Sequence, residues 1–234
     1  MPRSRSSSSP TRSDVVLDQI RSDVLNGRLD PGSRLGFVDL GERYKVSTGV
    51  LREVLPRLVE QGLATSEPQL GFRVIDVSPI RLSRLTDARV AIETLVTREA
   101  VTHGDIAWEA DVVGTHHALV RIGDSLTDGN IHEEWLVAHE AFHGAILRGC
   151  DNGYLVDIAS RLRSISEVYR CWSRSELAST TRDLAHEHRQ IMEAAIARDA
   201  DRAVELTETH IRRTTELLLL SAGATNDVSA AQSI

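Results

Sequence analysis

Proline is absent from the sequence after Pro79, so no residue of this type interrupts helical hydrogen bonding as far as Ile234. Apolar residues recur there at helical spacing, no strand-like alternation or internal repeat is visible, and the breaks fall mainly at Gly, Asn and Asp. The pattern predicts helices over approximately 80–102, 106–127, 131–148, 153–172, 181–198 and 200–221. Residues 78–222 are therefore expected to form an all-α antiparallel bundle of about six helices, followed by a loose tail over 223–234.

The residues before Ser78-Pro79 have a different pattern, and this dipeptide is the predicted domain boundary. The expected elements are a helix from a Ser13 or Asp14 cap to Asn26-Gly27, a short helix over 37–44, a third helix capped by Ser47, and β-prone pieces at 63–66 and 72–77. Three helices followed by a hairpin predict a winged helix-turn-helix over residues 13–77. The Ser/Arg-rich residues 1–12 are expected to be a disordered tail.

Composition and charge exclude several classes of protein. Hydrophobic residues make up 41% of the chain and charged residues 26%, which excludes overall disorder, and aromatic residues at 4% are too few for a base-stacking platform. The net charge of −7 is uneven, because residues 1–77 carry +1 and the remainder −8, so DNA binding by the first part is not excluded. Two cysteines, no secretory signal and no apolar run long enough for a membrane span predict a cytoplasmic protein.

The third helix of the winged helix-turn-helix carries the candidates for reading DNA. Apolar residues at 50, 51, 54, 55 and 58 are expected to face inward, which leaves the first turn facing outward. Free N–H groups at a helix start suit a phosphate, and an arginine fork can bond two acceptors on guanine. The predicted contacts are Ser47 for phosphate, Thr48, Gly49 and Arg52 for bases, and Arg34, Arg43 and Arg73 for the DNA backbone. For Arg52 by itself, a solvated surface charge is the alternative interpretation.

Several short motifs follow one another in residues 13–77. They are Asn26 to Leu35, Asp39-Leu40, Val46 to Leu55, Arg57-Leu58, Gln61-Gly62-Leu63 and Gly71. In this order they resemble the GntR family of bacterial transcription regulators. The resemblance implies a homodimer that binds a short palindromic operator in double-stranded DNA, and it adds the wing residue Gly71 to the DNA contacts.

Two residues depart from the pattern of that family. Thr48 stands where the family usually has an arginine that reads guanine, so the operator sequence is not implied. Pro56 lies inside the third helix, where proline costs about 3 kcal/mol relative to alanine, and a kink is expected there.

Four of the nine histidines fall on apolar stripes of the predicted bundle. His139 and His143 share one helix face at i and i+4, and His188 and His210 lie in register with apolar residues of two other helices. Three helices that direct imidazole into one interior are typical of bundle metal sites, although a lone buried ring is usually a hydrogen-bonded core histidine. Nitrogen ligands predict a divalent transition metal, zinc first, with nickel or copper as alternatives. The other five histidines are expected at breaks or polar faces: His103, His116, His117, His132 and His186.

The helical part also resembles the FCD effector domain of FadR-like GntR regulators. The matching residues are Arg89 with Glu93, His139 to His143, Asn152, His188 and His210. The resemblance implies a divalent metal beneath a small acid effector, but His139 stands at the usual Asp position. Arg89 is either a contact for an effector carboxylate or an intrahelical partner of Glu93, and Asn152 is either an effector contact or the cap of the following helix.

Three functions of different classes follow from these features. The leading one is a ligand-responsive transcription regulator, and family members of this kind are mostly repressors released by an effector. A metal sensor, with the ion as signal, is the second. A metalloenzyme is the third, but neither HExxH nor a nucleophile elbow is present, and no enzyme activity is expected.

Overall fold

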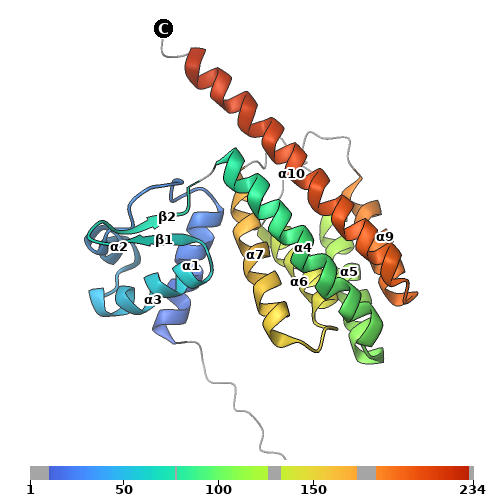
Figure 1. The fold of residues 1–234 in the computed structure, drawn as a ribbon. Coiled ribbons are helices and arrows are strands. Elements are labelled where there is room, and N and C mark those ends of the chain that lie inside the picture. The colour runs from blue at the N-terminus through green and yellow to red at the C-terminus, as the bar shows by residue number, and fades with distance from the viewer. Residues whose placement is uncertain (1–10, 77, 126–132, 173–182, 232–234) are drawn as a thin grey trace, which may run out of the picture. The chain divides into compact units, whose positions relative to one another are not determined.

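The computed structural model describes residues 11–76, 78–125, 133–172 and 183–231 of the chain. The chain divides into two compact units, Met1–Val77 and Ser78–Ile234, which are described separately below (Figure 1). The predicted fold class is confirmed, since three helices and a hairpin in the first unit are followed by a unit that is helical throughout its described residues.

The first unit is the predicted winged helix-turn-helix. Its elements are α1 (Arg12–Leu25), α2 (Phe37–Tyr44), α3 (Thr48–Glu60), β1 (Ala64–Glu67) and β2 (Gly71–Val74). Helix α1 begins earlier than predicted, because the hydroxyl of Thr11 accepts a hydrogen bond from the Asp14 amide while the Asp14 carboxylate accepts one from the Thr11 amide. The predicted caps Ser13 and Asp14 are therefore wrong, and Ser13 instead donates a hydrogen bond of 2.8 Å to Glu53 of α3.

The core of this unit forms where α1 and α3 pack together. The buried side chains come from positions spaced three and four apart, and they include Val16, Ile20 and Val24 of α1 and Leu51, Val54, Leu55 and Leu58 of α3. Val50, predicted to face inward, is only half-buried. Helix α3 continues through the exposed Pro56, and the expected kink stays a prediction.

Two turns fix the shape of the unit. Lys45 adopts a left-handed conformation with φ of 52°, and this single residue after α2 produces the tight turn into α3. Strands β1 and β2 are antiparallel, with Ala64 opposite Val74 and Glu67 opposite Gly71. Gly71 has φ of 85°, a backbone conformation that favours glycine, at the start of β2.

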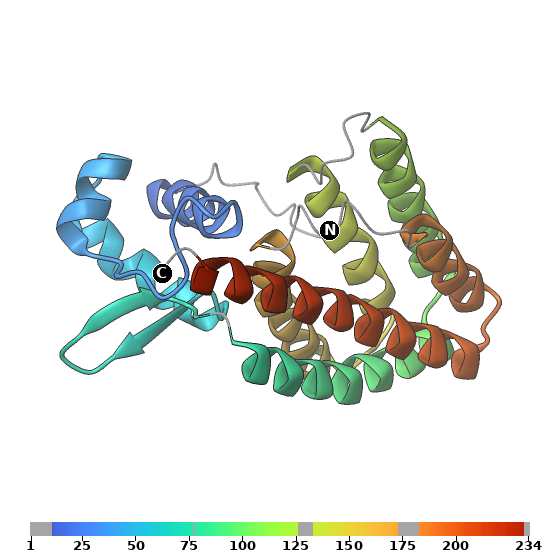
Figure 2. The same ribbon diagram turned by 90° about the horizontal axis from the view of Figure 1, so that it is seen from above.

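The second unit is a bundle of helices. They are α4 (Pro79–His103), α5 (Ile106–Ser125), α6 (Glu133–Leu147), α7 (Gly153–Trp172), α9 (Leu184–Ile196) and α10 (Ala200–Ala231). Helices α4 and α10 lie side by side along much of their length, as Figures 1 and 2 show. Further contacts join α5 to α6, α4 to α7, and α9 to α10.

Helix α10 differs from the prediction at its end. It continues to Ala231, past the expected end near residue 221, and the loose tail expected over 223–234 stays a prediction. The segment holds no proline, and Gly223 alone costs only about 1 kcal/mol in a helix. None of the helices within the described ranges is long and apolar enough to cross a membrane.

Candidate nucleic-acid interface and metal centre

The first turn of α3 presents the residues predicted to read DNA. Ser47, Thr48, Gly49 and Arg52 are all exposed. Ser47 occupies the N-cap position, yet its hydroxyl makes no capping hydrogen bond, so it is available to an outside acceptor. Arg52 forms no hydrogen bond or ion pair with any residue that the structure describes. The backbone N–H groups at the start of α3 therefore suit a phosphate, and the guanidinium of Arg52 suits a base edge.

The three arginines predicted to contact the DNA backbone lie in different environments. Arg34 is exposed next to Arg73, and the Arg73 guanidinium donates a hydrogen bond of 3.0 Å to the Gly32 carbonyl. Arg43 forms an ion pair of 2.7 Å with Asp23. Of the three side chains, that of Arg43 forms the most contacts within the unit and that of Arg34 the fewest.

Asp23 joins α1 to the loop after it and to α2. Its carboxylate accepts hydrogen bonds from Tyr44 at 2.7 Å and from Arg28, besides the ion pair with Arg43. Burial alone would raise the pKa of Asp23, but the bond from Tyr44 and the two arginines lower it below the usual value. The Arg43 side chain therefore has a structural partner within the unit, and its role toward DNA stays a prediction.

Gly71, the predicted wing contact, lies at the start of β2 in a backbone conformation that favours glycine. A side chain added at this residue would meet no atom within 4 Å, so open space rather than a close approach surrounds it. Its positive φ, not crowding, is the reason for glycine at this position.

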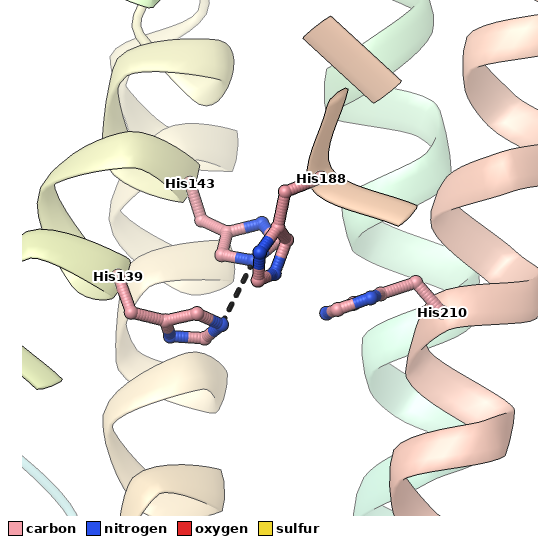
Figure 3. A group of neighbouring side chains, drawn as sticks. All are labelled: His139, His143, His188 and His210. Atoms are coloured by element: carbon pink, nitrogen blue, oxygen red, sulfur yellow. Dashed lines mark hydrogen bonds between the residues drawn. The ribbon is translucent and has the colours of Figure 1, made fainter. Parts of the chain in front are cut away.

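The second candidate site lies inside the helical unit. His139 and His143 extend from α6, His188 from α9 and His210 from α10, and Figure 3 shows the four rings pointing toward one another. All four are buried, and one ligand nitrogen from each lies within 4.8 Å of the others. The Nε2 atoms of His139 and His143 are 3.1 Å apart. We call these four residues the histidine cluster.

The electrostatic environment favours the neutral form of the α6 histidines. Burial holds the pKa of His139 well below its ordinary value of 6.5, and the charges of Arg170 and other neighbours lower it further. Burial and then Arg163 act in the same direction on the pKa of His143. Neutral imidazole is the form that binds a metal, so His139 and His143 fit a divalent ion without prior loss of a proton.

Neighbouring side chains fix the orientation of two rings of the cluster. Nδ1 of His210 lies 2.9 Å from a carboxylate oxygen of the buried Glu187, which leaves Nε2 of that ring toward the cluster. Trp135 stacks on His139 with ring centroids 4.7 Å apart and an angle of 19° between the planes. Glu187 and Trp135 were not among the predicted site residues, because neither has a sequence signal apart from adjacency to a histidine stripe.

Changing Glu187 to Gln is expected to weaken metal binding about 10–100-fold, because the amide cannot stabilise Nδ1–H of His210 as a carboxylate does. The measurement is competition for the metal with a chromophoric chelator, as a function of pH. The matched control is Glu193→Gln, an exposed position on the same helix. Equal affinities of wild type and Glu187→Gln at every pH would show that Glu187 does not orient a ligand.

The lowered pKa values also predict how the stability of the chelator-treated protein depends on pH. Above an unfolded-state pKa of 6.5, His139 and His143 are neutral in both states and have no effect. Below it, only the unfolded chain takes up their protons, so stability falls by up to about 1.4 kcal/mol per histidine for each pH unit. Melting temperatures from about pH 7.5 to about pH 5.5 test this. The variant His139→Gln/His143→Gln is expected to lose the extra slope and His117→Gln to keep it, and a slope unchanged in the double variant would contradict the assignment.

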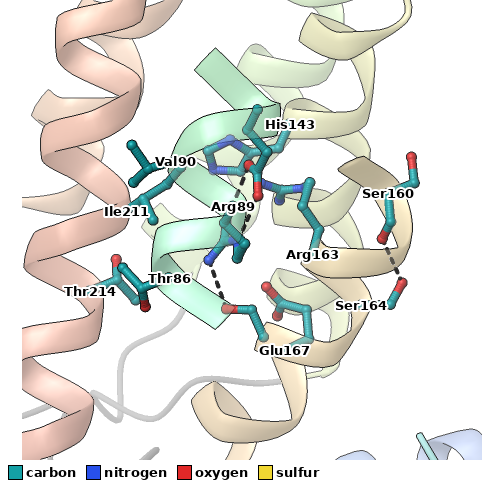
Figure 4. Close-up of polar contacts among 12 residues, drawn as sticks. Thr86, Arg89, Val90, His143, Ser160, Arg163, Ser164, Glu167, Ile211 and Thr214 are labelled. Atoms are coloured by element: carbon teal, nitrogen blue, oxygen red, sulfur yellow. Dashed lines mark hydrogen bonds and ion pairs between the residues drawn. The ribbon is translucent and has the colours of Figure 1, made fainter. Parts of the chain in front are cut away.

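Arg89 and Asn152, the two residues predicted to contact an effector, both form contacts within the protein. Arg89 pairs with Glu93 at 2.5 Å and donates a hydrogen bond of 2.7 Å to Ser166, so the intrahelical alternative describes its contacts (Figure 4). Asn152 is exposed, and its side-chain oxygen accepts a hydrogen bond of 3.4 Å from the Leu155 amide, which caps α7.

One histidine prediction is wrong. His116, expected at a polar face, is buried with its ring 5.4 Å from that of Phe142, because it continues the apolar stripe of Val112 and Leu119 on α5. The spacing of His116 from Val112 and Leu119, at four and three residues, is the signal that could have identified it as buried. Of the others expected at the surface, His103, His117 and His186 are exposed, and His132 lies outside the described residues.

Both units match known domain families. Residues 12–74 match the family "Bacterial regulatory proteins, gntR family", and residues 84–213 match the FCD domain.

Two curated relatives match more than four fifths of the chain. The chain is 34% identical over 200 residues to BphR, an HTH-type transcriptional regulator of Paraburkholderia xenovorans strain LB400, covering 85% of this chain and 81% of that protein. It is 33% identical over 195 residues to the HTH-type transcriptional repressor GlaR of Escherichia coli K12, covering 82% and 89%. The E. coli McbR/YncC structure shares the fold, with a TM-score of 0.75, 18% identity and coverage of 91% and 99%.

These relatives are transcription regulators, and the metalloenzyme alternative therefore has no support. The motifs of the first unit, the helical architecture of the second and both family matches agree with one another. The chain belongs to the GntR family of bacterial transcription regulators, in the FadR-like branch in which an FCD domain follows the DNA-binding domain.

Proposed function

We propose that this transcription regulator is a repressor whose helical unit binds a divalent transition metal and a small carboxylate effector. The observation that carries the proposal is the histidine cluster, in which four buried ligand nitrogens lie within 4.8 Å of one another. The similarity to GlaR, a transcriptional repressor, supports repression as the sign of the regulation. A regulator of bacterial genes acts at the chromosome, so the proposal places the protein in the cytoplasm.

The chemistry of the cluster favours particular metals. Imidazole nitrogens suit zinc, nickel and copper, whereas magnesium and calcium prefer oxygen ligands. When bound, such an ion supplies an undiminished charge of +2 that attracts an anion, because none of the four ligands is charged. Glu187 holds the His210 ring and Trp135 packs against the His139 ring, so that both rings are oriented before binding.

We further propose that two copies of the chain bind a palindromic operator. Each would place Thr48, Gly49 and Arg52 of α3 in a major groove and Gly71 of the wing beside the backbone, with half-sites about 34–36 Å apart. Ser47 would bind a phosphate through its free hydroxyl. The helical units of the dimer would have two arrangements, and the effector would bind one of them more tightly. Binding would shift the population toward that arrangement and so change the affinity for the operator.

The second candidate function is that of a metal sensor. The presence of four histidine ligands in the cluster favours it. Four protein nitrogens complete a tetrahedral zinc site, so such an ion would need no further ligand. The ion itself would then be the signal for release from DNA.

Operator binding distinguishes the two candidates. An operator selected from random DNA is titrated with the chelator-treated protein, the zinc-loaded protein, and the zinc-loaded protein with small carboxylates. Release that requires both zinc and a carboxylate supports the effector mechanism, and release by zinc alone supports the sensor. Operator affinity that responds to neither would refute both.

A further inference from the structure

Three polar contacts attach the first turn of α1 to α3 and to the turn before α3. They are a hydrogen bond of 3.4 Å from Arg12 to the Lys45 carbonyl, one of 2.8 Å from Ser13 to Glu53, and an ion pair of 2.9 Å between Asp14 and Arg57. Helix α1 also packs against α3 through its apolar face (Figure 1). The start of α1 is therefore fixed relative to α3.

These contacts place the start of α1 at the edge of the surface predicted to read DNA. Glu53 follows Arg52 directly and lies one helical turn after Gly49, and both of these neighbours are exposed. Lys45, which accepts the bond from α1, is exposed two residues before Ser47. The part of the chain that precedes α1 therefore joins the unit beside the first two turns of α3.

Residues 1–10, which we call the N-terminal segment, are basic and nearly devoid of apolar side chains. They comprise Arg3, Arg5, five serines, two prolines and one methionine, with no acidic residue. A segment of this composition has little apolar surface to bury, so charge is its means of binding a partner. Asp14 and Glu53, the carboxylates at the point where the segment joins the unit, already have partners within it. The DNA duplex beside α3 is a polyanion and fits the charge of the segment.

The length of the N-terminal segment allows it to reach the minor groove next to a half-site. With α3 in a major groove, the adjacent minor groove lies about half a turn away, or roughly 17 Å along an axis whose full turn is 34–36 Å. An extended chain spans up to about 3.3–3.6 Å per residue, so the six residues that separate Arg5 from Thr11 allow about 20 Å. Arginine suits this groove, because A·T pairs make it narrow and negative and the guanidinium is weakly hydrated.

We propose that the N-terminal segment binds the minor groove beside each half-site through Arg3 and Arg5. It adds affinity for the operator and a preference for A·T pairs in the flanking sequence. The contacts of Arg12, Ser13 and Asp14 hold the end of the segment next to α3, so that binding of α3 brings the two arginines to the groove at high effective concentration. This inference rests on the proposed placement of α3 in the major groove.

Operator binding at several salt concentrations tests whether the segment contacts DNA. Full-length wild type and Arg3→Ala/Arg5→Ala are titrated with the selected operator, extended by about ten base pairs at each end. We expect the variant to bind at least about tenfold more weakly, and the slope of log K against log salt to become less steep by about 0.9 for each arginine lost. Arg81→Ala/Arg84→Ala, at two exposed positions of α4, removes the same charge and is expected to keep the wild-type slope. Equal affinity and slope in wild type and Arg3→Ala/Arg5→Ala would overturn the inference.

The flanking sequence tests the groove. Wild type is expected to bind the operator at least about threefold more tightly with A·T flanks than with G·C flanks. Arg3→Lys/Arg5→Lys is expected to keep the salt slope and lose this preference, because the ammonium group is strongly hydrated. A wild type that binds both flanks equally would overturn the assignment to the minor groove.

A comparison with Arg52→Ala separates this inference from the proposed function. If Arg52→Ala weakens operator binding and Arg3→Ala/Arg5→Ala does not, the placement of α3 stands and the role of the N-terminal segment is refuted. If Arg52→Ala binds the operator as wild type does, the proposed placement of α3 is refuted, and the inference that depends on it is refuted as well.

Discussion

Replacing His143 with alanine is expected to abolish tight metal binding. His143 is buried and supplies one of the four nitrogens of the histidine cluster, one turn of α6 from His139. Removal of an outer partner of a ligand already weakens binding about 10–100-fold, and removal of the ligand itself should exceed that. The measurement is metal content after purification without chelators, together with affinity from chelator competition.

A stability measurement accompanies this prediction. A ligand present at about 100 times its Kd stabilises the folded state by about 2.7 kcal/mol, so added zinc should raise the melting temperature of wild type. His143→Ala should lose that increase, and His117→Ala, an exposed histidine on α5, should keep it. Full metal occupancy and an undiminished zinc-dependent increase in His143→Ala would remove the cluster as the binding site.

Replacing Arg52 with alanine is expected to weaken specific operator binding by about 1–3 kcal/mol per half-site and to relax the sequence preference there. Arg52 is exposed on the first turn of α3 and has no partner among the described residues, so its guanidinium is available for a base. The measurement is binding to the selected operator and to non-specific DNA at several salt concentrations.

Arg52→Lys separates base reading from general attraction. Lysine keeps the positive charge but lacks the planar fork, so it should preserve non-specific affinity and lose part of the sequence preference. Arg81→Ala, at an exposed position of α4, controls for the loss of one positive charge. If Arg52→Ala binds the operator as wild type does, Arg52 is an ordinary solvated charge and α3 does not read DNA through it.

The sequence predicted those parts of the fold that depend on local patterns. The spacing of Leu51, Val54 and Leu55 identified the buried face of α3, and the positions of His139 and His143 placed them on one face of α6. Both follow from the 3.6-residue period of a helix, which neighbouring residues alone determine. The breaks at His103-Gly104 and from Gly149 to Gly153 likewise separated α4 from α5 and α6 from α7 to within a few residues, and the break expected at Asp128-Gly129-Asn130 lies outside the described residues.

Other features depend on contacts that the local pattern does not contain. Thr11 rather than Ser13 caps α1. The Ser13 hydroxyl instead donates a hydrogen bond to Glu53, which lies forty residues later in the sequence. Arg89 has a good partner at i+4, and only the tertiary structure shows that Ser166 engages it too. The contacts of Arg170 and Glu187 with histidines of other helices could not be predicted, since they depend on how the helices pack.

The central claim is that the histidine cluster binds a metal through four imidazoles. X-ray absorption at the zinc edge of the zinc-loaded full-length protein tests it most directly. We predict one zinc per chain with nitrogen ligands at about 2.0–2.1 Å and the outer scattering of several imidazole rings. A first shell dominated by oxygen or sulfur, or a spectrum unchanged in His143→Ala, would contradict the claim.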